Sequence, residues 1–255
     1  MAGLFDLTGR CALVTGASRG IGRGLALALA GQGATVCVHY LHDRDEAEAV
    51  VDAIRTDGGT AVMVGGDLSA EGSAREMARQ AANLLPGPVD ILVANAGIEL
   101  REDFGTITWD AARAQFDTNL MATVELIEAV TPGMIARGWG RVVTIGSVQQ
   151  VRPHPKATIY AGLKSALENI ARNLALQLAG TGVTVNTIAP GVIETDRNAA
   201  SLSDPNYRAW IIGRIPMGSL GEPKDCAGGV ILLCSYAGRT ITGVNLLIDG
   251  GMHLG

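Results

Sequence analysis

The chain has 255 residues, a formal net charge of −5 and no long basic run, which argues against nucleic acid and anionic membranes as main partners. Hydrophobic residues make up 47% of the chain and aromatic residues 4%, so we expect a large core of Val, Ile, Leu and Ala. No basic-then-apolar leader opens the sequence, and no apolar run approaches the roughly 18 residues that span a bilayer. These features predict a soluble, cytoplasmic protein.

Short apolar runs alternate with longer amphipathic segments along the whole chain. The short runs are rich in Val, Ile and Leu, which is typical of strands buried on both faces. The predicted strands are Cys11–Thr15, Thr35–His39, Ala61–Val64, Ile91–Ala94, Arg141–Ile145, Thr184–Ile188 and Asn245–Ile248. The predicted helices between them are Gly20–Ala30, Arg44–Thr56, Ala70–Leu85, Trp109–Arg137, Thr158–Ala179 and Pro223–Tyr236.

This alternation predicts parallel pairing with right-handed crossovers. We therefore expect a single α/β domain over residues 1–255, a Rossmann-type doubly wound sheet of about seven parallel strands with helices on both faces. A TIM barrel is the structural alternative, but the sequence falls short of the eight strand–helix units of that fold. The stretch 193–217 reads poorly as helix or strand and is long for a loop, so we expect a substrate lid there.

A glycine-rich turn, T-G-A-S-R-G-I-G over residues 15–22, separates the first strand from the first helix. Small residues let the backbone approach a pyrophosphate, and the helix start offers free N–H groups and a positive dipole end. A tight turn without any ligand is the alternative interpretation. The residues predicted to hold a dinucleotide here are Gly16, Ser18, Arg19, Gly20, Ile21 and Gly22.

The end of the second strand bears on the choice between NAD and NADP. An acidic residue there would bind the ribose 2′-hydroxyl of NAD, but Tyr40 takes that place. Arg19 could meet a 2′-phosphate, because a guanidinium matches phosphate geometry. Asp43 and Asp45 are close enough in sequence to leave NAD(H) possible. The residues therefore favour NADP(H).

Tyr160 and Lys164 are spaced i and i+4 on a predicted helix, so they share one face. A nearby ammonium favours the phenolate form, so Lys164 should lower the pKa of Tyr160 and make it a usable general acid and base. Ser147 follows the fifth strand at the carboxyl edge, where open α/β sheets bind ligands, and its hydroxyl could donate to a substrate oxygen. Singly, a surface Tyr/Lys pair and a capping serine are ordinary features.

The glycine turn, the N-A-G at 95–97, the S-x₁₂-Y-x₃-K from Ser147 to Lys164 and the P-G at 190–191 together resemble the short-chain dehydrogenase/reductase family in order and interval. The resemblance runs from about residue 8 to residue 252. It implies an NAD(P)(H)-dependent oxidoreductase that moves a hydride between nicotinamide and a carbonyl or secondary alcohol. It also implies a homotetramer.

Further residue roles follow from this resemblance alone. Asn119 would hold a water that links Lys164 to bulk solvent, and Lys164 would bind the nicotinamide ribose. The other implied cofactor contacts are Asp67 and Leu68 at the adenine, Asn95, Ala96 and Gly97 beside the cofactor, and Pro190, Gly191, Val192 and Thr195 at the carboxamide. Two positions depart from the family pattern: Ala94 replaces an Asn, and Leu163 replaces a small polar residue beside Lys164.

The substrate class rests on the residues around Ser147 and Gly97. The predicted substrate contacts are Ser147, Gln149 and Tyr160, and the polar neighbours Gln150, Arg152, His154, Glu99 and Arg101 favour a polyhydroxylated or otherwise polar substrate. The S-V-Q-Q run is similar to sugar dehydrogenases of the family, and A-P-G-V-I-E-T-D to its 3-oxoacyl-carrier-protein reductases. An acyl-carrier partner would need a basic docking patch, for which Arg137, Arg141 and Arg172 are candidates.

A non-catalytic binding protein and a metalloprotein are two other classes of function. A dinucleotide-binding sensor or scaffold without turnover is the alternative from another class, but binding alone does not require Asn119, Ser147, Tyr160 and Lys164 together. A metal centre is not predicted, because the four cysteines form neither a CxxC pair nor a zinc spacing: Cys11, Cys37, Cys226 and Cys234. We expect these thiols to be buried and reduced.

Overall fold

The computed structural model describes residues 3–255. Seven strands form one sheet in the order β3-β2-β1-β4-β5-β6-β7, and every pairing between neighbours is parallel. The strands are β1 Cys11–Val14, β2 Thr35–Tyr40, β3 Thr60–Gly65, β4 Ile91–Ala94, β5 Gly140–Ile145, β6 Val183–Pro190 and β7 Asn245–Ile248. The predicted Rossmann-type doubly wound sheet is therefore confirmed, with strand ends within two residues of their predicted places.

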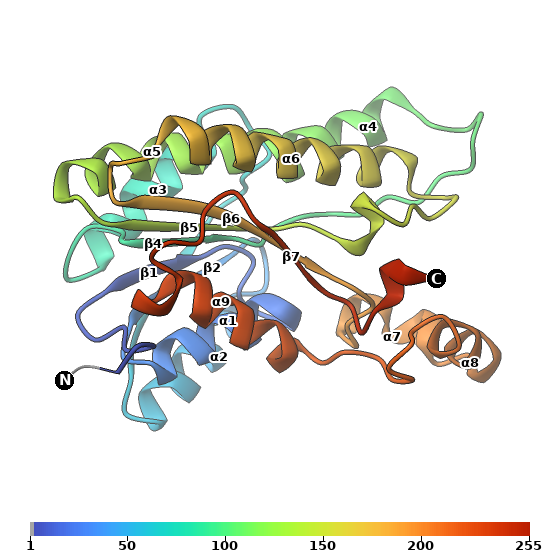
Figure 1. Cartoon of the computed structure of the whole chain (residues 1–255), viewed down its shortest axis with the longest axis horizontal. Helices are drawn as coiled ribbons and strands as arrows, with labels where there is room; N and C mark the ends of the chain where they lie inside the picture. The colour runs from blue at the N-terminus through green and yellow to red at the C-terminus, as the bar shows by residue number, and fades with distance from the viewer. Residues whose placement is uncertain (1–2) are drawn as a thin grey trace.

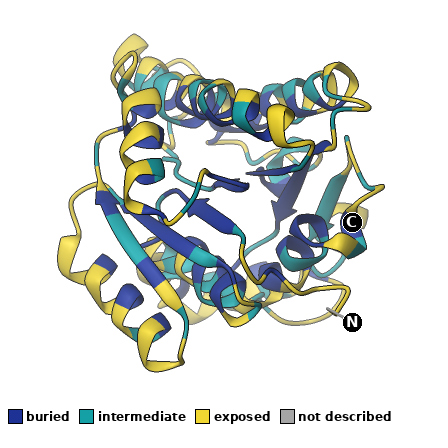
Figure 2. Cartoon of the chain, turned by 90° about the vertical axis from the view of Figure 1, so that its left-hand side faces the viewer, coloured by how far each residue is buried: buried dark blue, intermediate teal, exposed yellow. Residues whose placement is uncertain are grey.

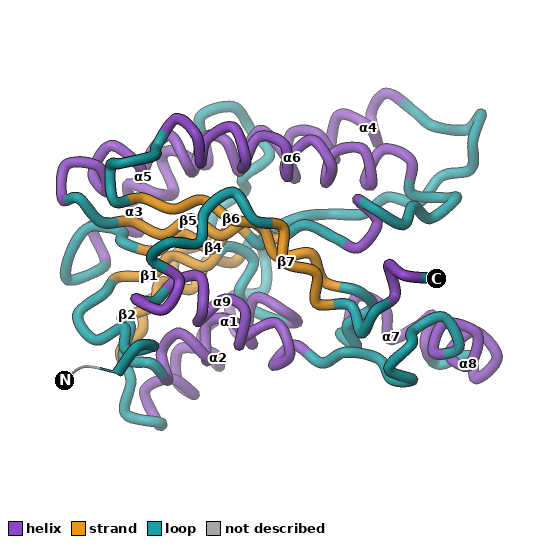
Figure 3. The backbone as a smooth tube through the Cα atoms, viewed as in Figure 1, coloured by secondary structure: helices purple, strands orange, loops and turns teal. Residues whose placement is uncertain are grey.

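Helices cover both faces of this sheet (Figure 1), and Figure 3 shows the strands as the middle layer. One face carries α3 Ser73–Leu84, α4 Trp109–Phe116, α5 Ala122–Arg137 and α6 Thr158–Gln177. The other face carries α1 Gly20–Gly31, α2 Arg44–Thr56 and α9 Pro223–Cys234. Within residues 3–255, no helix is both long enough and apolar enough to cross a bilayer.

The core consists of two apolar clusters, one on each face of the sheet. Val14 packs into the cluster under α1 and α9, whereas its neighbour Leu13 packs into the cluster under α3 and α5. Successive strand residues point to opposite faces, so a strand covered on both sides is apolar at most positions. Figure 2 shows the consequence: buried strands lie between helices whose outer faces are exposed. The four cysteines are buried as free thiols.

Two helical segments differ from their predicted form. The helix expected from Ala70 begins at Ser73, because Gly72 before it has a left-handed φ of +78°. The segment 109–137 is not one uniform α-helix: a π-helical turn, η1 Asp117–Met121, separates α4 from α5. A π-turn changes which side chains face the sheet after it, and such turns are frequent at functional sites.

The stretch 193–217, expected to be neither helix nor strand, contains two short helices, α7 Asp196–Leu202 and α8 Pro205–Ile212. The signals that start them are local caps. Thr195 and Asn198 form a capping box before α7, and the Asp204 carboxylate accepts from the Asn206 N–H at the start of α8. The helices lie beyond the end of the sheet, near the C-terminus (Figure 1). The sequence did not indicate these helices because the prediction relied on periodicity, which helices this short do not display.

Candidate active site

The glycine turn joins β1 to α1 and is packed too closely for side chains. Gly16 and Gly20 have φ values of +59° and +55°, which residues with a Cβ rarely adopt. A Cβ on Gly22 would lie 2.2 Å from the Gly16 carbonyl oxygen, and one on Gly16 would lie 3.0 Å from the Cα of Ala96. The first N–H groups of α1, which have no intrahelical acceptors, therefore face the carboxyl edge of the sheet.

Side chains from β1 and β4 hold this turn in place. The Thr15 hydroxyl accepts hydrogen bonds from the N–H groups of Asn95 and Ala96, both at 3.0 Å. The Asn95 amide nitrogen donates to the carbonyls of Thr15, at 2.8 Å, and Gly16, at 3.0 Å. The residues expected to border a cofactor thus brace the turn expected to bind its pyrophosphate. The turn leaves no room for side chains and presents the backbone N–H groups of a helix start, an arrangement that fits the pyrophosphate of a dinucleotide.

The segment after β6 approaches the same turn. Gly191, just beyond Pro190, donates its N–H to the Ile248 carbonyl at 2.9 Å. Thr195 caps α7, and its methyl carbon would be 3.5 Å from a Cβ on Gly20. The turn and the predicted carboxamide segment, about 170 residues apart in sequence, therefore lie together at the carboxyl ends of the strands, where doubly wound folds bind ligands. We call this strand-end region the groove.

Residues predicted for the adenine end lie at the same edge. Asp67 follows β3 and accepts from the Ser69 N–H at 2.8 Å, which lowers the pKa of its carboxyl. Arg19 is exposed, and its guanidinium lies 3.8 Å from the Asp43 carboxylate. The remaining predicted cofactor contacts, from the whole length of the site, are buried or half-buried: Ser18, Ile21, Tyr40, Leu68, Gly97 and Val192.

Ser147 and Tyr160 meet at the centre of the groove. Ser147 caps a 3₁₀ turn, η2 Val148–Gln150, where its oxygen accepts from the Gln149 N–H at 3.2 Å. Its side chain is close enough to the hydroxyl of Tyr160 to lower the Tyr160 pKa, and Tyr160 is 7% exposed. Tyr160 and Lys164 share one face of α6, with the Lys164 Nζ 5.6 Å from the centre of the Tyr160 ring. The three side chains predicted to act together are thus neighbours.

The ionisation of Tyr160 differs from the expectation. Burial raises the pKa of Tyr160 above its ordinary value, and the nearby Glu99 raises it further. The cation that opposes these effects is Arg197, not Lys164. Burial lowers the pKa of Lys164 to about 7, and its Nζ donates to the Ile145 carbonyl at 2.7 Å. A buried lysine that is easily deprotonated cannot act as the fixed positive charge the sequence suggested.

Asn119 lies in the π-turn η1, beside Gly97 and Lys164. A Cβ on Gly97 would be 2.5 Å from the Asn119 Oδ1 and 3.6 Å from the Lys164 Nζ. The Asn119 amide is paired with the main chain of Ile98: Oδ1 accepts from its N–H and Nδ2 donates to its carbonyl, both at 2.9 Å. A relay water could use the second lone pair of Oδ1, the second N–H of Nδ2 or the Asn119 main-chain carbonyl.

Arg197 is a site residue that the sequence reasoning did not single out. It belongs to α7, its Nη2 donates to the Gly97 carbonyl at 2.5 Å, and its charge influences both Tyr160 and Lys164. The available signal was a cation two positions after Thr195, inside the expected lid. Only the fold of α7 brings that cation to the reactive hydroxyl.

Polar side chains form one wall of the groove next to Tyr160. The Glu99 Oε1 accepts from the Arg101 Nε at 3.0 Å and from the Gln149 Nε2 at 3.2 Å. The Gln149 Oε1 is buried and has no hydrogen-bond partner within the described part of the chain. A buried amide oxygen without a donor costs free energy, and a bound hydroxyl would satisfy it.

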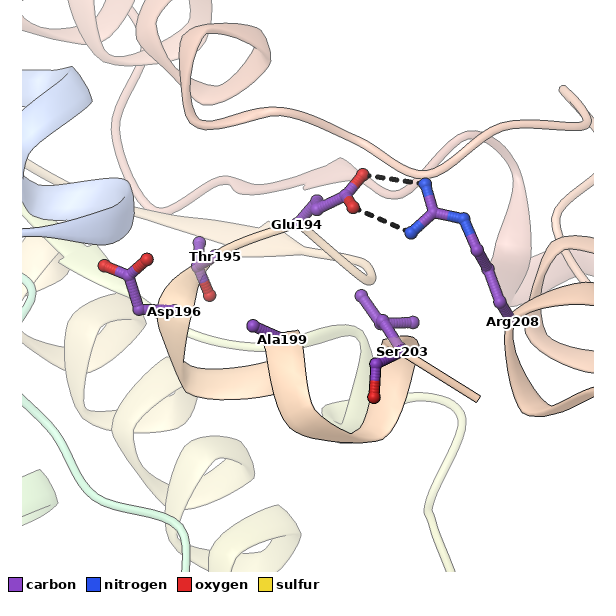
Figure 4. A pocket seen from close by; sticks show the side chains of 7 residues that line it. Glu194, Thr195, Asp196, Ala199, Ser203 and Arg208 are labelled. Atoms are coloured by element: carbon purple, nitrogen blue, oxygen red, sulfur yellow. Dashed lines mark hydrogen bonds and ion pairs between the residues drawn. The ribbon is translucent and has the colours of Figure 1, made fainter. Parts of the chain in front are cut away.

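Figure 4 shows a second hollow, between α7 and α8, at the foot of the expected lid. Glu194 accepts two hydrogen bonds there from the Arg208 guanidinium, at 2.7 and 2.9 Å. Thr195 lines this hollow and also lies against the glycine turn. The hollow therefore adjoins the groove, while the reactive hydroxyl lies outside it.

Comparison with known proteins gives matches along nearly the whole chain. A family model described as Enoyl-(Acyl carrier protein) reductase matches residues 16–253. The L-rhamnose 1-dehydrogenase (NAD(P)(+)) of a Sphingomonas species is 33% identical over 97% of this chain and 98% of its own.

Two solved structures show the same similarity in three dimensions. A 3-oxoacyl (acyl-carrier-protein) reductase of Agrobacterium tumefaciens with NADP bound is 39% identical, with a TM-score of 0.92 over 97% of this chain and 95% of that one. A gluconate 5-dehydrogenase of Burkholderia cenocepacia in complex with NADP and tartrate is 32% identical, with a TM-score of 0.92 over 99% and 98%.

Proposed function

The chain belongs to the short-chain dehydrogenase/reductase family of NAD(P)(H)-dependent oxidoreductases, and from this premise we propose that it interconverts a sugar- or polyol-like alcohol and its carbonyl, with NADP(H) as the preferred cofactor. The observation that carries the proposal is the buried Tyr160 side chain, which lies near Ser147 and near the polar side chains of Glu99 and Gln149. A hydrophobic acyl chain offers no hydrogen-bonding groups to these polar side chains, whereas a polyol supplies hydroxyls that they can bind.

The chain's own residues manage the oxygen and the proton. Ser147 and Tyr160 hold the reacting oxygen, and Tyr160 gives a proton to it when a carbonyl is reduced or takes one when an alcohol is oxidised. Lys164, with a pKa of about 7, exchanges that proton near neutral pH, and Asn119 orders the exit towards solvent. The bound nicotinamide supplies or accepts the hydride. Preorganised donors that need no rearrangement account for much of the rate.

The cofactor lies along the strand ends in this proposal, from the glycine turn to Thr195. Arg19 binds the 2′-phosphate of NADP(H), in place of the exposed Asp43 carboxylate that it now contacts. Arg19→Ala should therefore weaken NADPH binding about tenfold and leave NADH binding unchanged, because a charge-assisted hydrogen bond contributes roughly 1.5–3 kcal/mol. Equal effects on the two cofactors in fluorescence titrations would remove Arg19 from this role.

The carrier-protein alternative rests on the Agrobacterium relative, but its candidate docking residues are engaged elsewhere. Arg141 is 3% exposed, Arg137 contacts Asp90 at 3.3 Å, and Arg172 pairs with Glu168. These three arginines do not offer free charges to an acidic partner. A small-molecule substrate is therefore the better fit.

We further propose a substrate lid at 193–217 within a single domain, and a cytoplasmic homotetramer. The buried free thiols agree with a reducing compartment. Phe104 and Trp109 are 91% and 90% exposed at the start of α4, and large apolar side chains at a surface are typical of subunit interfaces. Sedimentation equilibrium measures the mass, and a monomer at micromolar concentration would refute the tetramer.

A cofactor-linked activity screen tests the proposal. Aldoses, aldonates, polyols and 3-oxoacyl thioesters are offered with each cofactor, and absorbance of the reduced nicotinamide is followed. Tyr160→Phe should lower turnover by about 10²–10⁴-fold on any substrate found, with NADPH affinity kept, because it removes the transferable proton. Turnover of the thioesters alone would favour the reductase alternative, and NADPH binding with no turnover on any class would favour a sensor.

A further inference from the structure

His39 is a buried histidine, 2% exposed, near the carboxyl end of β2 and outside the predicted site. Its Nδ1 lies 3.0 Å from the main-chain nitrogen of Gly16, and its Nε2 lies 2.9 Å from the Gly66 carbonyl oxygen. A backbone N–H can only donate, so Nδ1 accepts, and the ring proton is on Nε2, which donates to Gly66. The ring is therefore a neutral strut between two backbone segments.

These two backbone segments, at Gly16 and Gly66, are part of or next to the predicted cofactor contacts. Gly16 is at the start of the phosphate turn, and both of its backbone polar groups are hydrogen-bonded. Its N–H donates to His39, and its carbonyl accepts from Asn95. Ala17 donates its N–H to the His39 carbonyl at 2.8 Å, so side chain and main chain of one residue hold the start of the turn. Gly66 stands next to Asp67, at the adenine end.

We propose that His39 is a positioning residue for the dinucleotide, which holds the phosphate turn and the adenine segment in their binding arrangement before the cofactor arrives. A turn that is already ordered loses less conformational freedom on binding, so the affinity is higher. Without the ring acceptor, the Gly16 N–H would be buried and unpaired, and the turn would have to shift to satisfy it.

The surroundings of the ring keep it in its neutral form. Burial lowers the pKa of His39, against the weaker opposing effects of the Gly66 carbonyl and the Asp67 carboxylate. A protonated ring would turn a second N–H towards the Gly16 N–H, where no acceptor would remain. The geometry and the ionisation therefore agree.

Three substitutions separate the two hydrogen bonds. His39→Asn places an oxygen at the δ position and can keep the bond from Gly16. His39→Gln places a donor at the ε position and can keep the bond to Gly66. His39→Leu keeps neither. Asn186→Leu is the matched control, because the buried Asn186 side chain also bonds the main chain, at Ile241 and Val244, and lies outside the site.

The test is NADPH affinity of the full chain by fluorescence titration, with the melting temperature of each ligand-free variant as a folding check. We expect His39→Leu and His39→Gln to bind about tenfold more weakly, and His39→Asn and the Asn186→Leu control to stay within about threefold of the wild type. The titration needs no substrate, so failure of the sugar assignment leaves it interpretable.

Two results would overturn the proposal. One is wild-type affinity in a folded Leu or Gln variant. The other is an Asn variant as weak as the Gln variant, a comparison that stands even if the Leu variant does not fold. A wild-type chain that binds neither NADPH nor NADH would overturn both this proposal and the proposed function.

Discussion

At the scale of single residues, the site combines two buried titratable side chains, Tyr160 and Lys164, with the cation of Arg197. Tyr160 is 7% and Lys164 4% exposed, and burial moves their pKa values in opposite directions. Both shifts favour the uncharged forms, so a proton transfer from Tyr160 to Lys164 would create two opposite charges that burial disfavours. Arg197, from α7, is the nearby charge that lowers the pKa values of both groups.

The buried lysine should cost stability in the ligand-free protein. The pKa of Lys164 falls from 10.5 to about 7 on folding, so the unfolded chain binds more protons between these pH values. The penalty is complete below pH 7 and disappears as the pH rises towards 10.5. Lys164→Met should therefore raise the free energy of unfolding by about 3 kcal/mol at pH 6, and by much less at pH 10.

Urea unfolding at the two pH values measures this difference. Lys224→Met is the matched control, because the Lys224 side chain is 76% exposed and its replacement should change stability little at either pH. A gain for Lys164→Met that does not depend on pH would show that the lysine is charged equally in both states.

At the scale of elements, the site is assembled from junctions rather than from the elements themselves. The β1–α1 turn, the end of β4, the η1 π-turn and the start of α7 each contribute one or two groups. Parallel strands end at the same edge of a sheet, so these junctions are brought together by topology. What each junction presents depends on its own backbone geometry.

The β1–α1 turn should not tolerate a single methyl group. Gly22→Ala would place a Cβ 2.2 Å from the Gly16 carbonyl oxygen and 2.5 Å from the Asn95 Nδ2. We expect about 1–3 kcal/mol of destabilisation and a loss of NADPH binding. Gly228→Ala in α9 is the control. A Cβ there meets open space, so the higher helix propensity of Ala should raise the free energy of unfolding by about 0.5–1 kcal/mol. Thermal melts and titrations that show both variants alike would contradict this account.

The Glu194–Arg208 pair should hold α8 against the segment that precedes α7. Arg208→Ala would remove both hydrogen bonds to Glu194, which the surface position makes more important for local order than for global stability. We expect faster amide hydrogen exchange over residues 196–212, measured by mass spectrometry, with an unchanged melting temperature. Arg75→Ala breaks the exposed Arg75–Glu128 pair on α3 and α5, and should leave exchange in the lid as in the wild type.

At the scale of the whole molecule, the groove crosses the sheet from the β2–β3 side to the β6–β7 side. A ligand that spans it contacts segments whose connections run through both core clusters. Binding to the native state alone raises the free energy of unfolding of all the structure that unfolds with the site.

NADPH should accordingly stabilise the protein as a unit. At a hundredfold excess over its dissociation constant, it should add about 2.7 kcal/mol to the free energy of unfolding. Far-ultraviolet circular dichroism during urea unfolding reports this shift. Tyr160→Phe should show the same shift, because it changes proton transfer and not binding. An unshifted wild type would mean that the groove does not bind the cofactor.

The sequence by itself determined the order of strands and helices, the dinucleotide turn and the juxtaposition of Tyr160 with Lys164. These rest on local rules: strands buried on both faces are mostly apolar, only glycine fits the turn, and residues i and i+4 share a helix face. The tertiary structure alone decided that burial raises the Tyr160 pKa, that Arg197 is the nearby cation, and that His39 supports the turn. Burial and long-range contacts depend on which segments the fold packs together, and residue spacing carries no record of that.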